Sequence, residues 1–179
     1  MKANKKIEKQ IIKFIKQGKI FIYPTDTVYG IGCDALNKRA VERVKKIKGR
    51  EKAKPLSVIA PSKTWIFKNL EAKREIINKY FPGRYTLILK KKSPRFLSYV
   101  SSSDFLGVRI PKHKFTRLIK KASVPFITTS TNLSGEKPAS SLKDIDKKIL
   151  KKVDVVINGG KLHGKPSTII LENGKRLKR

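Results

Sequence analysis

Groups that bind metals or form disulfides are scarce in this chain of 179 residues. It has one cysteine, Cys33, and two histidines far apart in the sequence, His113 and His163. A single cysteine permits no disulfide within the chain, and one cysteine with two distant histidines is a poor set of metal ligands. We therefore expect no metal held by protein side chains, and a reducing cytoplasm is the simplest location.

Long apolar runs are also missing. No run approaches the roughly 18 residues that a membrane-spanning helix needs. The basic N-terminal segment, MKANKKIEKQ, leads into an amphipathic pattern rather than a continuous apolar stretch, so a secretory signal is not expected. Hydrophobic residues make up 39% of the chain and fall in separate clusters, which is adequate for one globular domain away from the membrane.

Acidic residues are few: 13 stand against 44 lysines and arginines, which gives a formal net charge of +31. Such an excess attracts polyanions with an affinity that depends strongly on salt. The basic residues are scattered along the whole chain, so an A/T-rich coding sequence explains the bias as well as an affinity for nucleic acid does. Charge alone leaves both interpretations open.

The spacing of apolar residues alternates between helical and strand-like along the chain. Gly18 is expected to end the first helix, and Asn173–Gly174 to form the turn of a final hairpin. Helices are predicted at about 4–17, 38–48 and 71–80, then one opened by Pro111 and one beginning near Ser141 and Asp144. Strands are predicted at 20–23, 56–60, 85–90, 105–110, 126–130, 153–157 and on both sides of the final turn. This alternation predicts a single α/β domain over residues 1–179.

The segment GGKLHGKPST, at 159–168, has glycine and lysine spacing like that of a phosphate-binding loop. Such a loop needs converging N–H groups and a helix directly after its lysine. Here Pro166 follows Lys165 and has no N–H to offer, and the next residues, STIILE, are strand-like. We therefore interpret the segment as a glycine-rich hairpin connection that brings the hydroxyls of Ser167 and Thr168 to the mouth of a strand.

Polar groups gather directly after predicted strands, where α/β proteins commonly position ligand sites. In YPTDTVYGIGCDA, at 23–35, Gly30 and Gly32 are expected to form a flexible turn beside a ligand. The alternative is a structural loop in which Asp26 accepts hydrogen bonds from backbone amides.

Two further stretches have the same character. In KIKGREKAKPLSV, at 46–58, Arg50 lies in a glycine–arginine turn that suits bidentate capture of phosphate or carboxylate. Basic residues at the end of a helix also complement its dipole, so a purely structural role for this stretch stays open as the alternative. In TTSTNLSGEKPA, at 128–139, hydroxyls and the amide of Asn132 are dense enough to suggest a loop that holds a substrate.

Taken together and in order, these motifs resemble the YrdC/Sua5 family of threonylcarbamoyl-AMP synthases. The matching segments are PTDTVYGIG, KGREKAKPL, PGRYTLIL, GVRIPKH, STNLSGEKPA and PSTII. They extend over nearly the whole chain, from about residue 7 to 172, and their combination is specific although any single motif would be weak. The length resembles that of the short, single-domain members.

The resemblance implies a twisted, open α/β sheet of mixed strands with a large, positively charged concave cavity. It implies a reaction in which L-threonine, bicarbonate (or CO2) and ATP yield threonylcarbamoyl-AMP and pyrophosphate, with Mg2+ bound to the ATP. A separate transferase complex would receive the product and modify the adenosine beside the anticodon of tRNAs that read codons starting with A.

The resemblance also assigns individual residues. Three positions match residues associated with L-threonine: Thr27, Arg109 and Ser167. Five match residues associated with ATP, the first two through a KxR motif and the last two through an SxN motif: Lys48, Arg50, Lys54, Ser130 and Asn132. Of these, Lys48 and Arg50 are the expected catalytic residues.

The implied chemistry suits this set of side chains. Formation of an adenylate by a carbamate needs no nucleophilic side chain, because a carbamate oxygen of the substrate attacks the α-phosphate. The site must instead gather a carboxylate, a carbamate and a triphosphate, whose charges repel, so cations must surround them. The residues suited to this are Lys48, Arg50, Lys54 and Arg109, and no catalytic histidine or cysteine is expected.

The sequence departs from the family pattern at two points, and we interpret the first as a difference of subtype. Ile59 occupies a position where Sua5-type members often carry a histidine, and the arginine near the end of the family's domain has no clean match, so Arg176 and Arg179 are left unassigned.

Two other functions stay open: a non-enzymatic module that binds double-stranded or structured RNA, and a related carbamoyl-adenylate enzyme that uses carbamoyl phosphate. The lack of accessory segments disfavours the latter.

Overall fold

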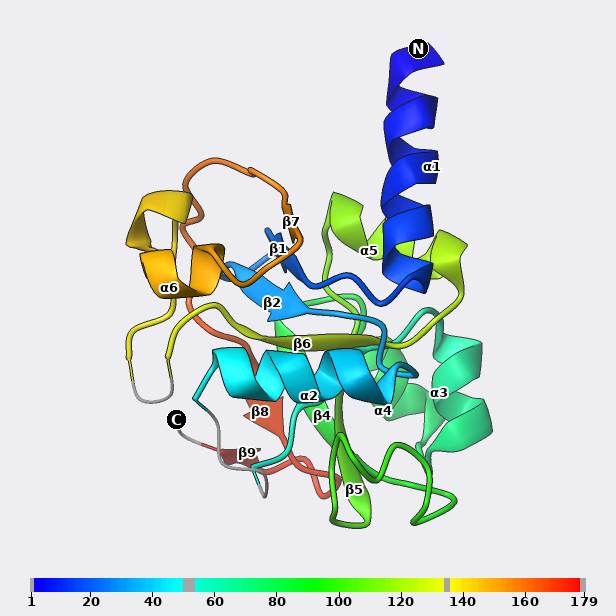
Figure 1. Cartoon of the computed structure of the whole chain (residues 1–179). Helices are drawn as coiled ribbons and strands as arrows, with labels where there is room; N and C mark the ends of the chain where they lie inside the picture. Colours follow the sequence, from blue (N-terminus) through cyan, green and yellow to red (C-terminus); the bar gives the residue numbers. More distant parts are fainter. Residues whose placement is uncertain (1, 50–53, 134–135, 178–179) are drawn as a thin grey trace.

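The computed structural model describes residues 2–49, 54–133 and 136–177, apart from the side chains of residues 2–4. Its helices are α1 (Lys2–Lys16), α2 (Lys38–Ile47), α3 (Lys63–Asn69), α4 (Arg74–Tyr80), α5 (Lys114–Ala122) and α6 (Lys147–Leu150), with one 3-10 turn, η1 (Leu142–Asp144). Figure 1 shows α1 packing beside α5 at its C-terminal end and projecting beyond the rest of the chain at its N-terminal end. Within these residues no helix is both long and apolar enough to span a membrane.

The strands of the described residues form one mixed sheet. They are β1 (Phe21–Tyr23), β2 (Gly30–Gly32), β3 (Ser57–Ile59), β4 (Tyr85–Lys90), β5 (Phe105–Arg109), β6 (Phe126–Ser130), β7 (Val155–Val156), β8 (Thr168–Ile170) and β9 (Arg176–Leu177). Their order is β7-β1-β2-β6-β3-β5-β4-β8-β9. The pairs β1/β7, β3/β5 and β4/β8 are parallel and the other neighbours antiparallel. The prediction of an α/β fold with an open mixed sheet is confirmed.

Alternate side chains along each strand face two different layers, because the side-chain period of a strand is two residues. On one face, Ile22, Val58 and Ile127 join a large apolar core with buried residues of α2, α3, α4 and α6. On the other face, Tyr23 and Phe126 join a smaller cluster with residues of α1 and α5. The second cluster covers only part of its face, so the same face has room for a site beyond it.

Most predicted elements are confirmed to within a few residues. The first helix ends before Gly18, which adopts a left-handed φ of 70°, and Gly174, with a φ of 80°, turns the chain between β8 and β9. Glycine adopts such angles without the steric cost that a Cβ imposes. The helix expected from Pro111 begins later, at Lys114, because the side chain of His113 accepts a hydrogen bond from the N–H of Phe115 and caps the helix there.

The helix α3 was not among the predicted elements. Its seven residues are few for a periodicity signal, and it follows directly on a buried strand. The hydroxyl of Ser62 accepts a hydrogen bond of 3.0 Å from the N–H of Trp65, which is a standard helix start.

The prediction of a flexible turn at Gly30 and Gly32 is wrong. Both residues belong to β2, a strand between β1 and β6. A Cβ on Gly32 would lie 1.7 Å from the carbonyl oxygen of Ile127, and a Cβ on Gly30 would lie 2.9 Å from the ring of Tyr23. Glycine is needed here because neighbouring groups approach closely, not because the chain bends.

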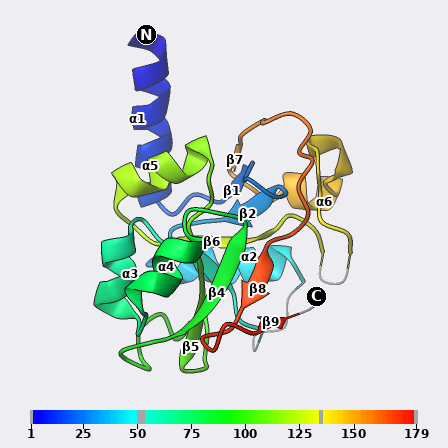
Figure 2. The same ribbon diagram turned by 180° about the vertical axis from the view of Figure 1, so that it is seen from behind.

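The prediction of a hairpin connection at 159–168 is also wrong. The strands before and after it, β7 and β8, are separated in the sheet by six other strands, so the segment is a long crossover. Figure 2 shows it in orange, passing near α6 on its way from β7 to β8. The glycines serve close packing: a Cβ on Gly159 would lie 2.5 Å from the ring of Pro24, and one on Gly164 would lie 2.4 Å from the carbonyl oxygen of Thr27.

Candidate active site

A cavity of about 350 Å³ opens on the sheet face that carries Tyr23 and Phe126. Three residues of one row of register partners line its floor: Ile88 on β4, Ser57 on β3 and Thr128 on β6. Gly107 on β5 lies between Ile88 and Ser57 in the same row. A Cβ on Gly107 would lie 2.3 Å from the Oγ of Ser57, so the absence of a side chain leaves the floor open. The described residues that line the cavity are Thr25, Thr27, Val28, Tyr29, Gly30, Pro55, Leu56, Ser57, Thr86, Ile88, Arg109, Thr128, Thr129, Ser130, Pro166, Ser167 and Ile169.

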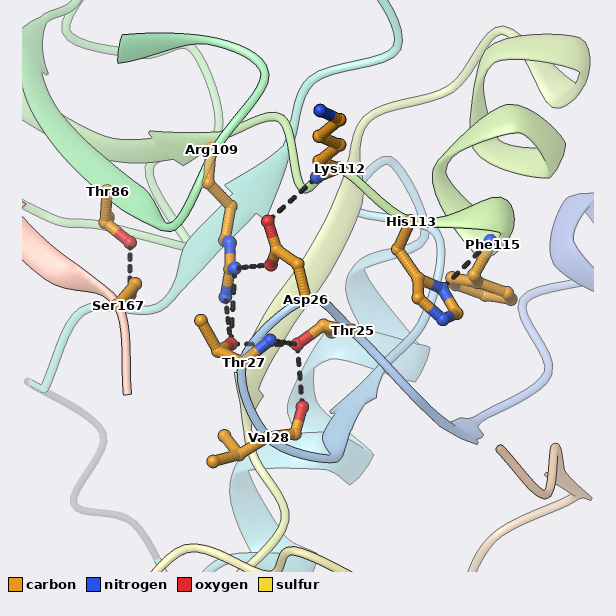
Figure 3. Close-up of polar contacts among 10 residues, drawn as sticks. All are labelled: Thr25, Asp26, Thr27, Val28, Thr86, Arg109, Lys112, His113, Phe115 and Ser167. Atoms are coloured by element: carbon orange, nitrogen blue, oxygen red, sulfur yellow. Dashed lines mark hydrogen bonds and ion pairs between the residues drawn. The ribbon is translucent and has the colours of Figure 1, made fainter. Parts of the chain in front are cut away.

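Arg109 brings a guanidinium into this cavity from the end of β5. A guanidinium nitrogen lies 2.7 Å from the Oδ1 of Asp26, and both side chains are 8% exposed. The Oδ2 of Asp26 accepts a hydrogen bond of 2.8 Å from the N–H of Lys112 (Figure 3). One carboxylate therefore fixes the guanidinium and the chain just after β5 at the same time. Asp26 therefore accepts a hydrogen bond from a backbone amide, as the structural alternative expected, but this amide belongs to Lys112 and not to the loop of Asp26 itself.

Hydroxyl protons in the loop after β1 can be assigned by counting. The Oγ1 of Thr25 donates its one proton to the carbonyl oxygen of Val28, at 2.7 Å. The contact of 2.8 Å between the hydroxyls of Thr25 and Thr27 therefore takes its proton from Thr27. The remaining lone pairs of the Thr27 hydroxyl face Arg109, whose two terminal nitrogens lie 3.3 and 3.4 Å away. As the loop stands, Thr27 orients the guanidinium and has no proton to give a ligand.

The crossover from β7 to β8 forms one wall of the cavity and is fixed by Tyr29. The phenol oxygen of Tyr29 accepts a hydrogen bond from the N–H of Gly159 and donates one to the carbonyl oxygen of Gly160, both at 2.8 Å. At the end of the crossover, the hydroxyl of Ser167 lies 2.8 Å from that of Thr86 on β4, and both side chains are buried. Ser167 thus reaches the cavity at a defined position.

Lys48 is buried at the C-terminal end of α2 and does not line the cavity. Its ammonium donates hydrogen bonds to the carbonyl oxygens of Ser130, at 2.5 Å, and Asn132, at 2.7 Å. The amide nitrogen of Asn132 in turn donates to the carbonyl oxygens of Leu133 and Glu136. The ammonium therefore shapes the turn that leaves β6, the turn in which Ser130 and Asn132 were predicted to meet ATP.

The other predicted cations lie outside the described lining. Lys54 is exposed and directly precedes Pro55, which lines the cavity. Arg50 lies outside the described residues. Within the described lining, Arg109 is the one charged side chain, and the rest are hydroxyl, apolar or tyrosine groups. The positive character expected of the cavity thus rests, among described residues, on Arg109, with Asp26 as its counterion.

The structure brings four of the predicted residues to one cavity from separate parts of the chain: Thr27, Arg109, Ser130 and Ser167. Lys48 and Asn132 lie just behind it. Sequence reasoning missed Ser57, Thr86 and Tyr29. The signal for the first two was a hydroxyl residue within an otherwise apolar strand, which breaks the run of core residues in SVI and in YTLIL.

Neither Cys33 nor His163 is among the described residues that line the cavity. Cys33 is fully buried, and burial raises the pKa of its thiol far above the usual value, so it is not a nucleophile. His163 is exposed on the crossover. In the described part of the chain, no group of three or more histidine, cysteine, aspartate or glutamate side chains is arranged to bind a metal ion.

Comparison with known proteins connects this cavity to a family. The chain is 42% identical over 175 residues to a putative threonylcarbamoyl-AMP synthase of Methanocaldococcus jannaschii, covering 93% of this chain and 83% of that protein. It is 32% identical to YciO of Escherichia coli, an uncharacterized protein, covering 90% of this chain and 81% of YciO.

The fold matches that of a structure with a bound amino acid. The crystal structure of Pyrococcus abyssi Sua5 complexed with L-threonine superposes with a TM-score of 0.81 at 29% identity, over 93% of this chain. This chain spans about half of that longer protein, 51% of its length. The family model Sua5_yciO_yrdC, described as "Telomere recombination", matches residues 13–178. The chain therefore belongs to the Sua5/YciO/YrdC family.

Proposed function

We propose that this protein is an L-threonylcarbamoyladenylate synthase, which converts L-threonine, bicarbonate or CO2, and ATP into threonylcarbamoyl-AMP and pyrophosphate. The observation that carries the proposal is the meeting of Thr27, Arg109 and Ser167 in one cavity. These residues come from the loop after β1, the end of β5 and the start of β8, and each matches a family position associated with threonine. The 42% identity to a putative synthase supports the same activity.

The threonine end of the site is built around Arg109. A guanidinium held by Asp26 and Thr27 presents a planar set of donors that suits a carboxylate. The hydroxyl of Ser167 lies on the crossover wall and offers a neutral contact, and the apolar side chains of Val28 and Ile169 line the same space. Such a mixture fits a small amino acid with one charged end and a short aliphatic side chain.

The nucleotide end lies at the exit of β6. Lys48 holds the turn that contains Ser130 and Asn132 by donating to two of its carbonyl oxygens. We assign this turn, with Lys54 and Arg50 on the segment after α2, to the ATP phosphates. Cations after α2 and polar groups held at a strand end together suit a triphosphate whose charge is redistributed during reaction.

The reaction balances without a nucleophilic side chain. The neutral amine of threonine attacks CO2, forms a C–N bond and loses one proton to water, which gives a carbamate. Starting from bicarbonate, one water is released and no proton is lost. A carbamate oxygen then attacks the α-phosphorus of ATP, a new P–O bond forms, and the bond to the leaving pyrophosphate breaks. The role of the residues is to hold the carbamate and the α-phosphate at attack distance and to compensate their charges.

Mg2+ enters this scheme with ATP. The cavity lining offers hydroxyls and one guanidinium, and the described residues supply no cluster of carboxylates. Phosphate oxygens and water are therefore the ligands that such a site leaves to Mg2+, which commonly keeps several waters in nucleotide complexes. When bound with ATP, the ion would neutralise part of the phosphate charge.

The test is to incubate the purified protein with ATP, Mg2+, bicarbonate and L-threonine and to detect the labile adenylate by mass spectrometry. We expect pyrophosphate release that requires both L-threonine and bicarbonate. ATP turnover that is indifferent to L-threonine would overturn the proposal.

Arg50→Ala should lower adenylate formation at least about a hundredfold, the size typical of one charge-stabilising contact. Full activity in this variant would remove Arg50 from the site.

The product defines the next step. A mixed anhydride of a carbamate and AMP is reactive, so an acceptor must take the threonylcarbamoyl group soon after release. From the family resemblance we propose that this acceptor is tRNA adenosine, reached through a separate transferase complex in the cytoplasm. We expect that, in a mixture with such a complex, the threonylcarbamoyl group is transferred to tRNA only when this protein is present.

We also propose that the basic exterior binds RNA, because one groove concentrates positive charge. The groove borders the start of α5, and among its described lining residues five are basic and none is acidic; the five are Lys63, Lys112, Lys114, Arg117 and Lys120. Replacing the last three by glutamine should reduce the slope of log affinity against log salt by about 2 to 3. Glutamines at three exposed lysines near α6 provide a matched control: Lys143, Lys147 and Lys148. An equal reduction in both variants would contradict a specific surface.

A further inference from the structure

Thr86 is a second hydroxyl at the Ser167 wall of the cavity. It lies on β4, which pairs in parallel with β8, and Ser167 immediately precedes β8. The two hydroxyl oxygens are 2.8 Å apart, and the residues are 3% and 5% exposed (Figure 3). Within the described residues, this is the one hydrogen bond that orients the hydroxyl of Ser167. Thr86 is therefore placed to control the direction in which that hydroxyl points.

The pair can present one proton to the cavity. Each hydroxyl has one proton and two lone pairs, and one of the two protons lies between the oxygens. If Thr86 donates to Ser167, the proton of Ser167 is directed to another acceptor. A hydroxyl that accepts one hydrogen bond also donates a stronger one, because chains of hydrogen bonds polarise one another.

The proton of Ser167 matters because the hydroxyls of the loop after β1 donate elsewhere. The proton of Thr25 goes to the carbonyl oxygen of Val28, and that of Thr27 goes to Thr25. The hydroxyls of that loop are thus committed to the orientation of Arg109. Of the three residues associated with threonine, Ser167 is therefore the one whose hydroxyl can still donate to an oxygen of the substrate, with Thr86 as its partner.

We propose that Thr86 is a positioning residue that donates its proton to Ser167, so that Ser167 donates its own proton to an oxygen of the amino-acid substrate. The proposal rests on the proposed function and deepens it at the threonine end of the site. It predicts that the side chain of Thr86 acts through Ser167 and not by an independent contact with L-threonine.

Three single variants and one double variant test this role, with steady-state adenylate formation as the readout. Thr86→Val keeps the shape of the side chain and removes the hydroxyl, and it should raise the KM for L-threonine about tenfold, with the KM for ATP changed less than about twofold. Thr86→Ser restores a hydroxyl and should restore the KM. Ser167→Ala should raise the KM at least as much as Thr86→Val.

The double variant Thr86→Val/Ser167→Ala decides between positioning and direct contact. If Thr86 acts through Ser167, adding Thr86→Val to Ser167→Ala should have almost no further effect on the KM for L-threonine. Effects that multiply, or a Thr86→Val protein with the wild-type KM, would overturn the proposal. Should Thr86→Val fail to fold, Thr86→Cys replaces the hydroxyl by a weak donor of similar size, and the same comparison decides. A wild-type protein that forms no adenylate would instead refute the proposed function.

Discussion

Arg109 and Asp26 form a buried ion pair at the edge of the candidate active site, with 2.7 Å between a guanidinium nitrogen and a carboxylate oxygen. The residues are 83 positions apart in the sequence, and the pair joins the loop after β1 to the end of β5. Asp26 compensates the charge of Arg109 and holds its guanidinium in the position where we propose that a carboxylate substrate binds. The pair therefore serves both the fold and the orientation of the binding group.

Asp26→Asn should destabilise the protein strongly. Both side chains are 8% exposed, so the variant leaves a buried guanidinium without its counterion, a loss of about 3–5 kcal/mol. Urea denaturation measures the free energy of unfolding. Glu71→Gln is the matched control, because the pair between Glu71 and Lys90 is about half-exposed and is worth less than about 1 kcal/mol. Equal losses in the two variants would contradict a special role for Asp26.

Tyr29→Phe should weaken the binding of L-threonine with a small effect on stability. The variant removes the two hydrogen bonds that hold Gly159 and Gly160, and with them the anchor of the crossover that ends at Ser167. Both glycines are exposed, so water replaces much of the lost bonding and the cost in stability is about 1 kcal/mol. The KM for L-threonine, measured by adenylate formation, should rise several-fold.

Tyr99→Phe provides the control for that experiment. The hydroxyl of Tyr99 donates a single hydrogen bond to the carbonyl oxygen of Ala35, and neither residue lines the cavity. Its loss should lower stability by a similar amount, about 1 kcal/mol, and leave the KM for L-threonine at the wild-type value. A KM that rises equally in both variants would show that general loosening, and not the crossover anchor, explains the result.

His113 should make stability depend on pH. Its Nδ1 accepts the capping hydrogen bond of α5 from Phe115, which requires the neutral ring. Burial lowers the pKa of His113, and the nearby charge of Lys114 adds to this, while Asp26 opposes it. Because the folded pKa lies below the unfolded value of about 6.5, the unfolded chain binds more protons between the two. The contribution of His113 is complete above about pH 6.5 and is lost as the pH falls through its folded pKa.

His113→Asn isolates this contribution. Asparagine is a good helix cap with an acceptor oxygen and does not titrate in this range. The difference in unfolding free energy between wild type and variant, measured by denaturation from pH 8 to pH 5, should change in favour of the variant as the pH falls. A difference that stays constant with pH would show that His113 does not couple protonation to folding.

The pattern of apolar residues was sufficient to predict most of the sheet and its helices. The strand at 126–130 was predicted correctly because it starts with a short apolar run that is buried on both faces. Amphipathic helices such as α2 were predicted correctly because their buried residues recur at helical spacing. The strand at Gly30–Gly32 gave no such pattern. Glycine is needed at position 32 because the carbonyl oxygen of Ile127, on a strand nearly one hundred residues later, leaves no space for a Cβ. A steric constraint between residues so far apart cannot be predicted from the local sequence.

The candidate site was predictable in membership more than in geometry. The order of the motifs predicted that Thr27, Arg109 and Ser167 belong to one site. The role of Thr27 in orienting the guanidinium follows from its hydroxyl contacts, which only the coordinates give. The sequence likewise indicated that GGKLHGKPST is not a phosphate-binding loop. Whether this segment forms a hairpin connection or a long crossover depends on which strands pair, and the sequence did not predict that. Tertiary pairing over long sequence distances decides both points.

Lys48→Met should impair ATP binding through the turn after β6. The side chain is 2% exposed, and methionine fills a similar volume, but the carbonyl oxygens of Ser130 and Asn132 lose the ammonium that holds them. We expect the KM for ATP to rise at least about tenfold, with a much smaller change in the KM for L-threonine. Lys46→Met, at an exposed position of the same helix, should leave both unchanged. A Lys48→Met enzyme with the wild-type KM for ATP would show that Ser130 and Asn132 need no such support, or that they do not meet the nucleotide.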